Sequence, residues 1–123
     1  MDYEVTDEGV ECTINIGKKD MVTVIFADAF DLDDTCKAWI SELTKNWHQS
    51  TKNIEEHISE YLNRVYSKDS KDYELEHIYI YIEDDIGTFG LMFRLGIDIE
   101  HGLGIKLEDF EIKKVGSADI AFV

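Results

Sequence analysis

DIEHGLGIKLEDFEIKKVGSADIAFV, residues 98–123, is the most distinctive stretch of the chain. Apolar residues alternate along it and glycines interrupt the run, at Leu103, Ile105, Leu107, Phe110 and Ile112 and at Gly102, Gly104 and Gly116. Alternation with glycine at the turns is typical of short antiparallel strands joined by tight connections. The stretch therefore predicts a β-meander.

Four strand patterns precede this meander. Residues 77–82, HIYIYI, alternate isoleucines with His77, Tyr79 and Tyr81, and residues 88–97 have one strongly apolar face. Nearer the N-terminus, residues 10–16 alternate and residues 21–27, MVTVIFA, are almost continuously apolar. The latter two segments predict a hairpin whose second strand is well covered.

The segment between these strand regions has helical periodicity. Apolar residues recur at steps of three and four positions, first at Cys36, Trp39, Ile40, Leu43 and Trp47. This pattern predicts an amphipathic helix over 33–48, capped by Asp31 or Asp33. A second apolar stripe predicts another helix over 54–66. Because the polar segment HQSTKN, residues 48–53, separates the two stripes, we expect an antiparallel helical hairpin.

These patterns together predict a single α+β domain over residues 1–123. The expected order is β-β-α-α-β-β-β-β, an antiparallel sheet of about five to seven strands with the two-helix hairpin packed on one face. A length of 123 residues fits one domain, and 44% hydrophobic residues supply enough apolar side chains for a core.

The formal net charge is −15 at pH 7, which limits the classes of partner. Proteins bind phosphate backbones through Lys and Arg that displace counterions, so nucleic acid and anionic membranes are disfavoured. The same negative field would accelerate association with a basic protein.

Cysteine content and the N-terminus predict a cytoplasmic protein. Cys12 and Cys36 lie in a strand-like and a helix-like segment, so we expect both to pack as small apolar residues in a reducing compartment. The acidic start MDYEVTDEGVE is unlike a signal peptide, and no apolar run approaches the roughly 20 residues of a membrane span.

One ionisable cluster, Asp98, Glu100 and His101, invites a metal-binding or acid–base interpretation. Carboxylates and imidazole are common metal ligands and proton carriers. On a strand, however, Asp98 and Glu100 share a face and His101 points away, so the three converge only if the chain bends at Gly102. The alternative is a turn histidine bonded to a neighbouring backbone group.

Acidic residues in two bends, with two nearby tyrosines, are the candidates for contact with a partner: Asp28, Asp31, Asp33, Asp34, Tyr79, Tyr81, Glu83, Asp84 and Asp85. The first bend lacks the glycine and the closing glutamate of a calcium loop, and helix capping is the alternative role of its acids. The tyrosines offer large contact areas with polar tips, or second-layer packing. The sequence carries no phosphate-loop, nucleophile-elbow or zinc-protease motif, so we expect no cofactor and no metal.

The C-terminal stretch resembles a group of small acidic bacterial α+β domains. Their signature reads acidic-x-Glu-His-Gly, an apolar strand, a turn, a second strand and Gly-x-x-Asp-Ile-Ala, here carried by Asp98, Glu100, His101, Gly102, Leu103, Gly104, Ile105, Gly116, Asp119, Ile120 and Ala121. The chain departs from it at Glu108–Asp109, where the relatives more often carry glycine. The resemblance implies an α+β domain, and some relatives look like immunity proteins encoded beside secreted toxins. It implies no activity and no cofactor.

Charge, size and resemblance together predict an interaction protein rather than an enzyme. The expected function is an immunity-type inhibitor that binds and neutralises a basic toxin domain, such as a nuclease. Two alternatives stay open: a metal-binding or hydrolytic domain centred on Glu100 and His101, and a housekeeping binding domain.

Overall fold

The structure, a computed structural model, describes residues 3–16, 21–27, 29–83 and 86–122. Seven strands, one long helix and one short 3-10 helix make up this part of the chain. In chain order these are β1 (Tyr3–Thr6), β2 (Gly9–Asn15), β3 (Met21–Ala27), α1 (Asp34–Tyr66), β4 (Tyr73–Glu83), β5 (Ile86–Leu95), β6 (Leu103–Glu108), β7 (Glu111–Gly116) and η1 (Ala118–Ala121). The strands form one sheet in which they lie in sequence order.

The long helix α1 replaces the predicted two-helix hairpin, which is wrong. The helix continues through residues 48–53 because this segment contains neither proline nor glycine. Its polar side chains bond back to the preceding turn instead of ending the helix: the Thr51 hydroxyl donates to the Trp47 carbonyl at 2.6 Å. The interruption of the apolar stripe at residues 48–53 therefore reflects a change in the surroundings of the helix and not the end of the helix.

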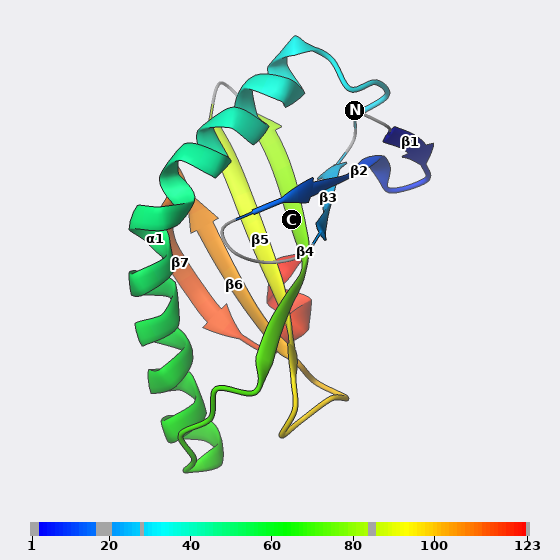
Figure 1. Ribbon diagram of the computed structural model, residues 1–123. Helices are drawn as coiled ribbons and strands as arrows, with labels where there is room; N and C mark the ends of the chain where they lie inside the picture. Colours follow the sequence, from blue (N-terminus) through cyan, green and yellow to red (C-terminus); the bar gives the residue numbers. More distant parts are fainter. Residues whose placement is uncertain (1–2, 17–20, 28, 84–85, 123) are drawn as a thin grey trace.

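The predicted all-antiparallel sheet is also wrong, because β3 and β4 pair in parallel with Phe26 opposite Ile80. A helical hairpin would return the chain to the end of the sheet that it left. A single helix of 33 residues, about 50 Å long, carries it to the other end instead, so β4 starts there (Figure 1). The result is a mixed sheet with the order β-β-β-α-β-β-β-β.

One face of the sheet packs against α1 and forms the main core. Ile78 and Ile80 of β4 point to this face and belong to the same buried cluster as Ile40 and Ile58 of the helix. Trp39 and Trp47 are partly buried against the cluster, and Cys12 and Cys36 are buried within it as free thiols, as predicted for the two cysteines. The isoleucine side of residues 77–82 is therefore the helix side.

The opposite face is partly covered by the C-terminal η1. Gly90 of β5 and Gly104 of β6 point to this face, and a Cβ on Gly104 would lie 2.7 Å from the Ser117 carbonyl oxygen. Glycine at both positions lets the backbone of η1 lie directly on the sheet. Phe122, just beyond η1, then packs on Tyr79 with ring centroids 5.1 Å apart.

Candidate functional site: an acidic end of the sheet

The parallel pairing of β3 and β4 brings the two predicted acidic bends to one end of the sheet. Both strands point the same way, so the segment that leads from β3 to α1 and the last residues of β4 lie at the same end of the sheet, which is the upper end in Figure 1. The first loop carries Asp31, Asp33 and Asp34, and β4 ends at Glu83. The fold thus joins segments that lie about 50 residues apart in the sequence.

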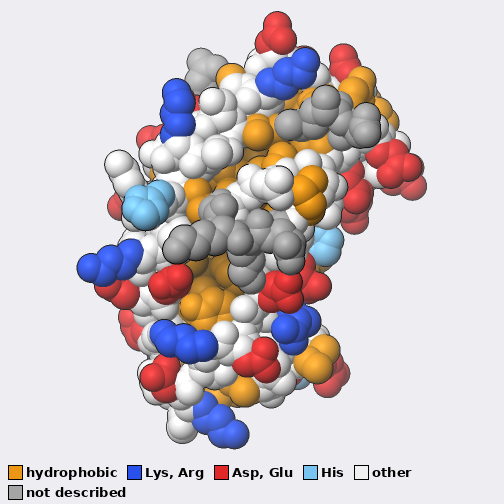
Figure 2. Space-filling model, viewed as in Figure 1, with side chains coloured by type: hydrophobic (Ala, Val, Ile, Leu, Met, Phe, Trp, Pro, Cys, Tyr) orange, Lys and Arg blue, Asp and Glu red, His pale blue; other side chains and the backbone are white. Residues whose placement is uncertain are grey.

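The register of the remaining strands adds further acids to this end. Gly9 pairs with Ala27, which places the β1–β2 turn there, and Glu108 pairs with Thr88, which places the β6–β7 turn there. We call this region the acidic end; its described carboxylates, all exposed, are Asp7, Glu8, Asp31, Asp33, Asp34, Glu83, Glu108, Asp109 and Glu111. Figure 2 shows acidic side chains at the top and upper right of the same view.

Two of these carboxylates also hold the local structure together. Asp33 is the N-cap of α1 and accepts a hydrogen bond from the Cys36 amide at 2.9 Å, which lowers the pKa of Asp33. Asp31 accepts hydrogen bonds from the Tyr3 hydroxyl at 2.5 Å and from the Leu32 amide at 2.9 Å. The predicted capping role is confirmed for Asp33, and both side chains stay exposed to a partner.

The described part of this end carries few basic side chains, and one of them forms an ion pair. Lys37 lies on the first turn of α1, and Lys113 of β7 forms an ion pair with Glu111 at 3.3 Å. The predicted candidates Asp28, Asp84 and Asp85 lie outside the described residues. The described part of the acidic end therefore presents an excess of negative charge to solvent.

An exposed aromatic side chain lies among the acids. Phe30 is 88% exposed and immediately precedes Asp31, while Ile86 at the start of β5 is 47% exposed. Large apolar side chains so open to water gain free energy when a partner covers them. Aromatic residues are frequent energetic anchors of protein interfaces. Sequence reasoning missed Phe30 because only the loop conformation shows that it points to solvent.

Tyr79 and Tyr81 lie on the face of the sheet opposite α1. Tyr79 is partly buried between Phe122 and His77, and burial, followed by the charges of Glu8 and Glu11, raises the pKa of its hydroxyl. Tyr81 is two residues nearer the acidic end and is also partly exposed. Tyr79 thus has the second-layer packing role weighed above, and Tyr81 borders the acidic end.

The Asp98, Glu100 and His101 cluster lies in the turn between β5 and β6, at the other end of the sheet. The His101 ring nitrogen Nδ1 is 3.0 Å from each carboxylate oxygen of Asp98, whose carboxylate also accepts a 2.6 Å hydrogen bond from the Tyr66 hydroxyl. Gly102, with φ of +61°, bends the chain here. Glu100 is exposed, and its negative charge is one of the causes that raise the pKa of His101. The arrangement fastens the C-terminal end of α1 to the turn.

Metal binding finds no support in the described geometry. Across residues 3–16, 21–27, 29–83 and 86–122, no three His, Cys, Asp or Glu side chains lie close enough together to hold an ion. No helix in this part of the chain is long and apolar enough to cross a membrane. The sequence matches no protein-family model and no curated protein, and the fold matches no solved structure.

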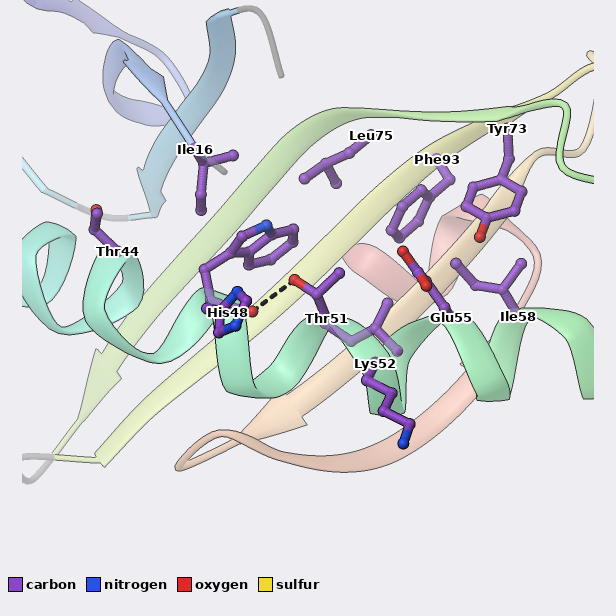
Figure 3. A pocket seen from close by; sticks show the side chains of 12 residues that line it. Ile16, Thr44, His48, Thr51, Lys52, Glu55, Ile58, Tyr73, Leu75 and Phe93 are labelled. Atoms are coloured by element: carbon purple, nitrogen blue, oxygen red, sulfur yellow. Dashed lines mark hydrogen bonds between the residues drawn. The ribbon is translucent and has the colours of Figure 1, made fainter. Parts of the chain in front are cut away.

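A cavity of about 490 Å³ beneath the middle of α1 is a feature that sequence reasoning missed. Its lining includes His48, Thr51 and Lys52 from the segment where the apolar stripe of the helix is interrupted, and Thr44 from the preceding turn. A run of small and polar residues facing a sheet is the signal that could have indicated it. Figure 3 shows the cavity between the helix and strands β4 and β5.

Proposed function

We propose that this protein is an acidic interaction protein that binds a basic protein through the acidic end of its sheet, in the manner of an immunity-type inhibitor. The observation that carries the proposal is that exposed carboxylates of the β1–β2 turn, the loop before α1, the end of β4 and the β6–β7 turn all lie at one end of the sheet, together with the exposed Phe30. The inhibited partner would be a basic toxin domain, such as a nuclease, and the compartment the cytoplasm.

The chemistry of the acidic end suits this role. A concentrated negative surface steers a cationic partner into an oriented encounter and raises the association rate, an effect that added salt weakens. Phe30 and Ile86 supply apolar area that a partner can bury once charges have aligned the two surfaces. Charge would thus govern the rate of encounter, and the apolar anchors the lifetime of the complex.

The enzyme alternative centred on Glu100 and His101 receives less support from the same structure. A general base must reach a substrate from a cleft, whereas the His101 side chain is 63% exposed and bonded to Asp98. The carboxylate of Asp98 is already engaged by Tyr66. The turn therefore has a structural explanation, and we do not propose catalysis there.

The test measures binding to the product of the gene adjacent to this one, which the proposal expects to be a basic protein. The acidic-end variant Glu8→Gln, Glu83→Gln, Glu108→Gln removes three exposed charges and no helix cap. We expect its dissociation constant in low salt to rise about tenfold. We expect Phe30→Ala to weaken binding as well, chiefly through faster dissociation.

A matched variant controls for total charge. The control variant also removes three negative charges, but from exposed positions on α1 and on the β5–β6 turn, away from the acidic end; it carries Glu56→Gln, Glu60→Gln and Glu100→Gln. We expect this variant to bind as the wild type does, within about twofold. An equal loss of affinity in the two variants would show that binding depends on net charge and not on the acidic end. Absence of binding by the wild type would refute the proposal.

A further inference from the structure

The cavity beneath α1 exists because the helix carries small polar residues where it crosses the sheet. Between Trp47 and Ile54 the helix presents Thr51 to this cavity rather than a large apolar side chain, and Ser50 lines a smaller separate pocket. The Thr51 hydroxyl is turned back to the Trp47 carbonyl, so it does not fill the space. The resulting volume, about 490 Å³, is within the range of sites for small molecules.

The walls of this cavity are mainly apolar and aromatic. Trp47 and Ile58 of the helix line it from one side, and Leu75, Tyr73 and Phe93 of the sheet line it from the other. Tyr73 and Phe93 are themselves packed edge to face, with ring centroids 5.9 Å apart. Figure 2 shows hydrophobic side chains at the bottom of a hollow in this face of the molecule. The cavity therefore offers both apolar surface and aromatic rings, whose faces carry a negative electrostatic potential.

The carboxylate of Glu55 lies at the opening of the cavity. In Figure 3 the side chain of Glu55 reaches up from α1 toward Phe93 and Tyr73, whereas that of Lys52 extends away from the sheet. Burial, followed by the negative charge of Glu55, raises the pKa of the Tyr73 hydroxyl, which is consistent with their proximity. Of the two charged lining residues that Figure 3 labels in the described part of the chain, the one directed at the cavity is thus the anion.

We propose that this cavity binds a small organic cation with an apolar body, such as an alkylammonium or arylammonium compound. Aromatic faces attract cations through their quadrupoles, the Glu55 carboxylate supplies a counter-charge, and the remaining walls bury the hydrocarbon part. The formal net charge of −15 further favours a cation over an anion of the same shape. This site lies toward the end of the sheet where β4 begins, and is independent of the acidic end.

The test compares two probes of nearly identical shape. Benzyltrimethylammonium carries a positive charge, and its isostere neopentylbenzene is neutral. Each is titrated into the ¹⁵N-labelled full chain while ¹H–¹⁵N NMR shifts are followed, including the Trp47 indole. We expect saturable shifts at the cavity residues and at least about fivefold tighter binding of the cation.

Three variants assign the effect to the cavity. Glu55→Gln should weaken binding of the cation about fivefold, whereas Glu56→Gln, which removes the same charge from the neighbouring position outside the cavity, should change it less than about twofold. Thr51→Trp should fill the space and abolish binding of both probes, provided that circular dichroism shows an unchanged fold.

Several outcomes would overturn the proposal. Equal affinity for the charged and neutral probes, or an unchanged affinity in Glu55→Gln, would show a purely apolar site without the proposed preference. Shifts confined to residues outside the cavity, undiminished binding by a folded Thr51→Trp protein, or no saturable shift at all would show that the cavity does not bind a cation.

Discussion

The Tyr66 hydroxyl donates a 2.6 Å hydrogen bond to Asp98 Oδ2, which joins the last residue of α1 to the turn after β5. The same carboxylate accepts a 3.2 Å hydrogen bond from the His101 amide. Asp98 therefore connects the end of a helix whose length sets the sheet topology with the turn that begins the C-terminal meander. The ionisation of Asp98 should therefore influence the stability of the helix end and of this turn.

Acid should destabilise the protein through Asp98. The Tyr66 hydrogen bond, followed by those from His101, lowers the pKa of Asp98 in the folded chain. A carboxylate with a lowered folded pKa stabilises the fold above its unfolded pKa, and this stabilisation is lost as the pH falls through the folded pKa. We expect the Tm of Asp98→Asn to depend less steeply on pH than that of the wild type between about pH 5 and pH 2. Parallel Tm–pH curves in thermal denaturation would contradict this role.

The imidazole of His101 should titrate above its ordinary value. The hydrogen bond to Asp98, then the charges of Asp98 and Glu100, raise the pKa of His101 from 6.5. Its contribution to stability is complete below the unfolded pKa and is lost as the pH rises through the raised folded pKa. NMR titration of the His101 ring should show a lower pKa in Asp98→Asn, and a smaller decrease in Glu100→Gln. An unchanged pKa in Asp98→Asn would refute the pairing.

Proline at position 52 distinguishes one continuous helix from two. Lys52 lies mid-helix and its side chain is exposed, so Lys52→Pro removes a helical hydrogen bond without disturbing the core. We expect it to lower the free energy of unfolding by about 3 kcal/mol or more. Lys52→Ala, the control, should change it by less than about 0.5 kcal/mol. Denaturant titration measures both, and a tolerated proline would instead indicate a loop between two helices.

In the turn between β6 and β7, a glycine substitution should raise the stability of the protein at one position and lower it at the next. Asp109 and Phe110 have φ of 51° and 64°, the left-handed region that favours glycine. Asp109→Gly should stabilise the protein by up to about 1 kcal/mol. Phe110→Gly should destabilise it by about 2 kcal/mol, because the Phe110 ring packs 4.9 Å from that of Phe89. Chemical denaturation that gave both variants the same sign would contradict this explanation.

The sequence indicates individual strands well because each has its own pattern. β3 coincides with the predicted segment 21–27, whose β-branched run is bounded by turn residues. The helix was predicted to stop at residues 48–53 because the apolar stripe lapses there. Hydrophobic periodicity reports what a helix faces, whereas its continuation depends on backbone hydrogen bonds and the absence of Pro and Gly.

The candidate site depends on topology, which local patterns do not contain. The acids of residues 31–34 and Glu83 were selected from composition, and the parallel pairing of β3 and β4 brings them together. Glu108 joins them through its register with Thr88, which no local signal specifies. The cavity corresponds to a pattern in the sequence, the polar residues His48, Thr51 and Lys52 where an apolar stripe would continue, but the same pattern is equally typical of a connector between two helices.

The most direct test is the association rate constant with the product of the adjacent gene, which we expect to be a basic protein, measured by stopped flow across a series of salt concentrations. We expect fast association that slows with salt, and a rate about tenfold lower at low salt for Glu8→Gln, Glu83→Gln, Glu108→Gln than for Glu56→Gln, Glu60→Gln, Glu100→Gln. Equal rates for the two variants, or a wild-type rate indifferent to salt, would contradict the assignment of recognition to the acidic end.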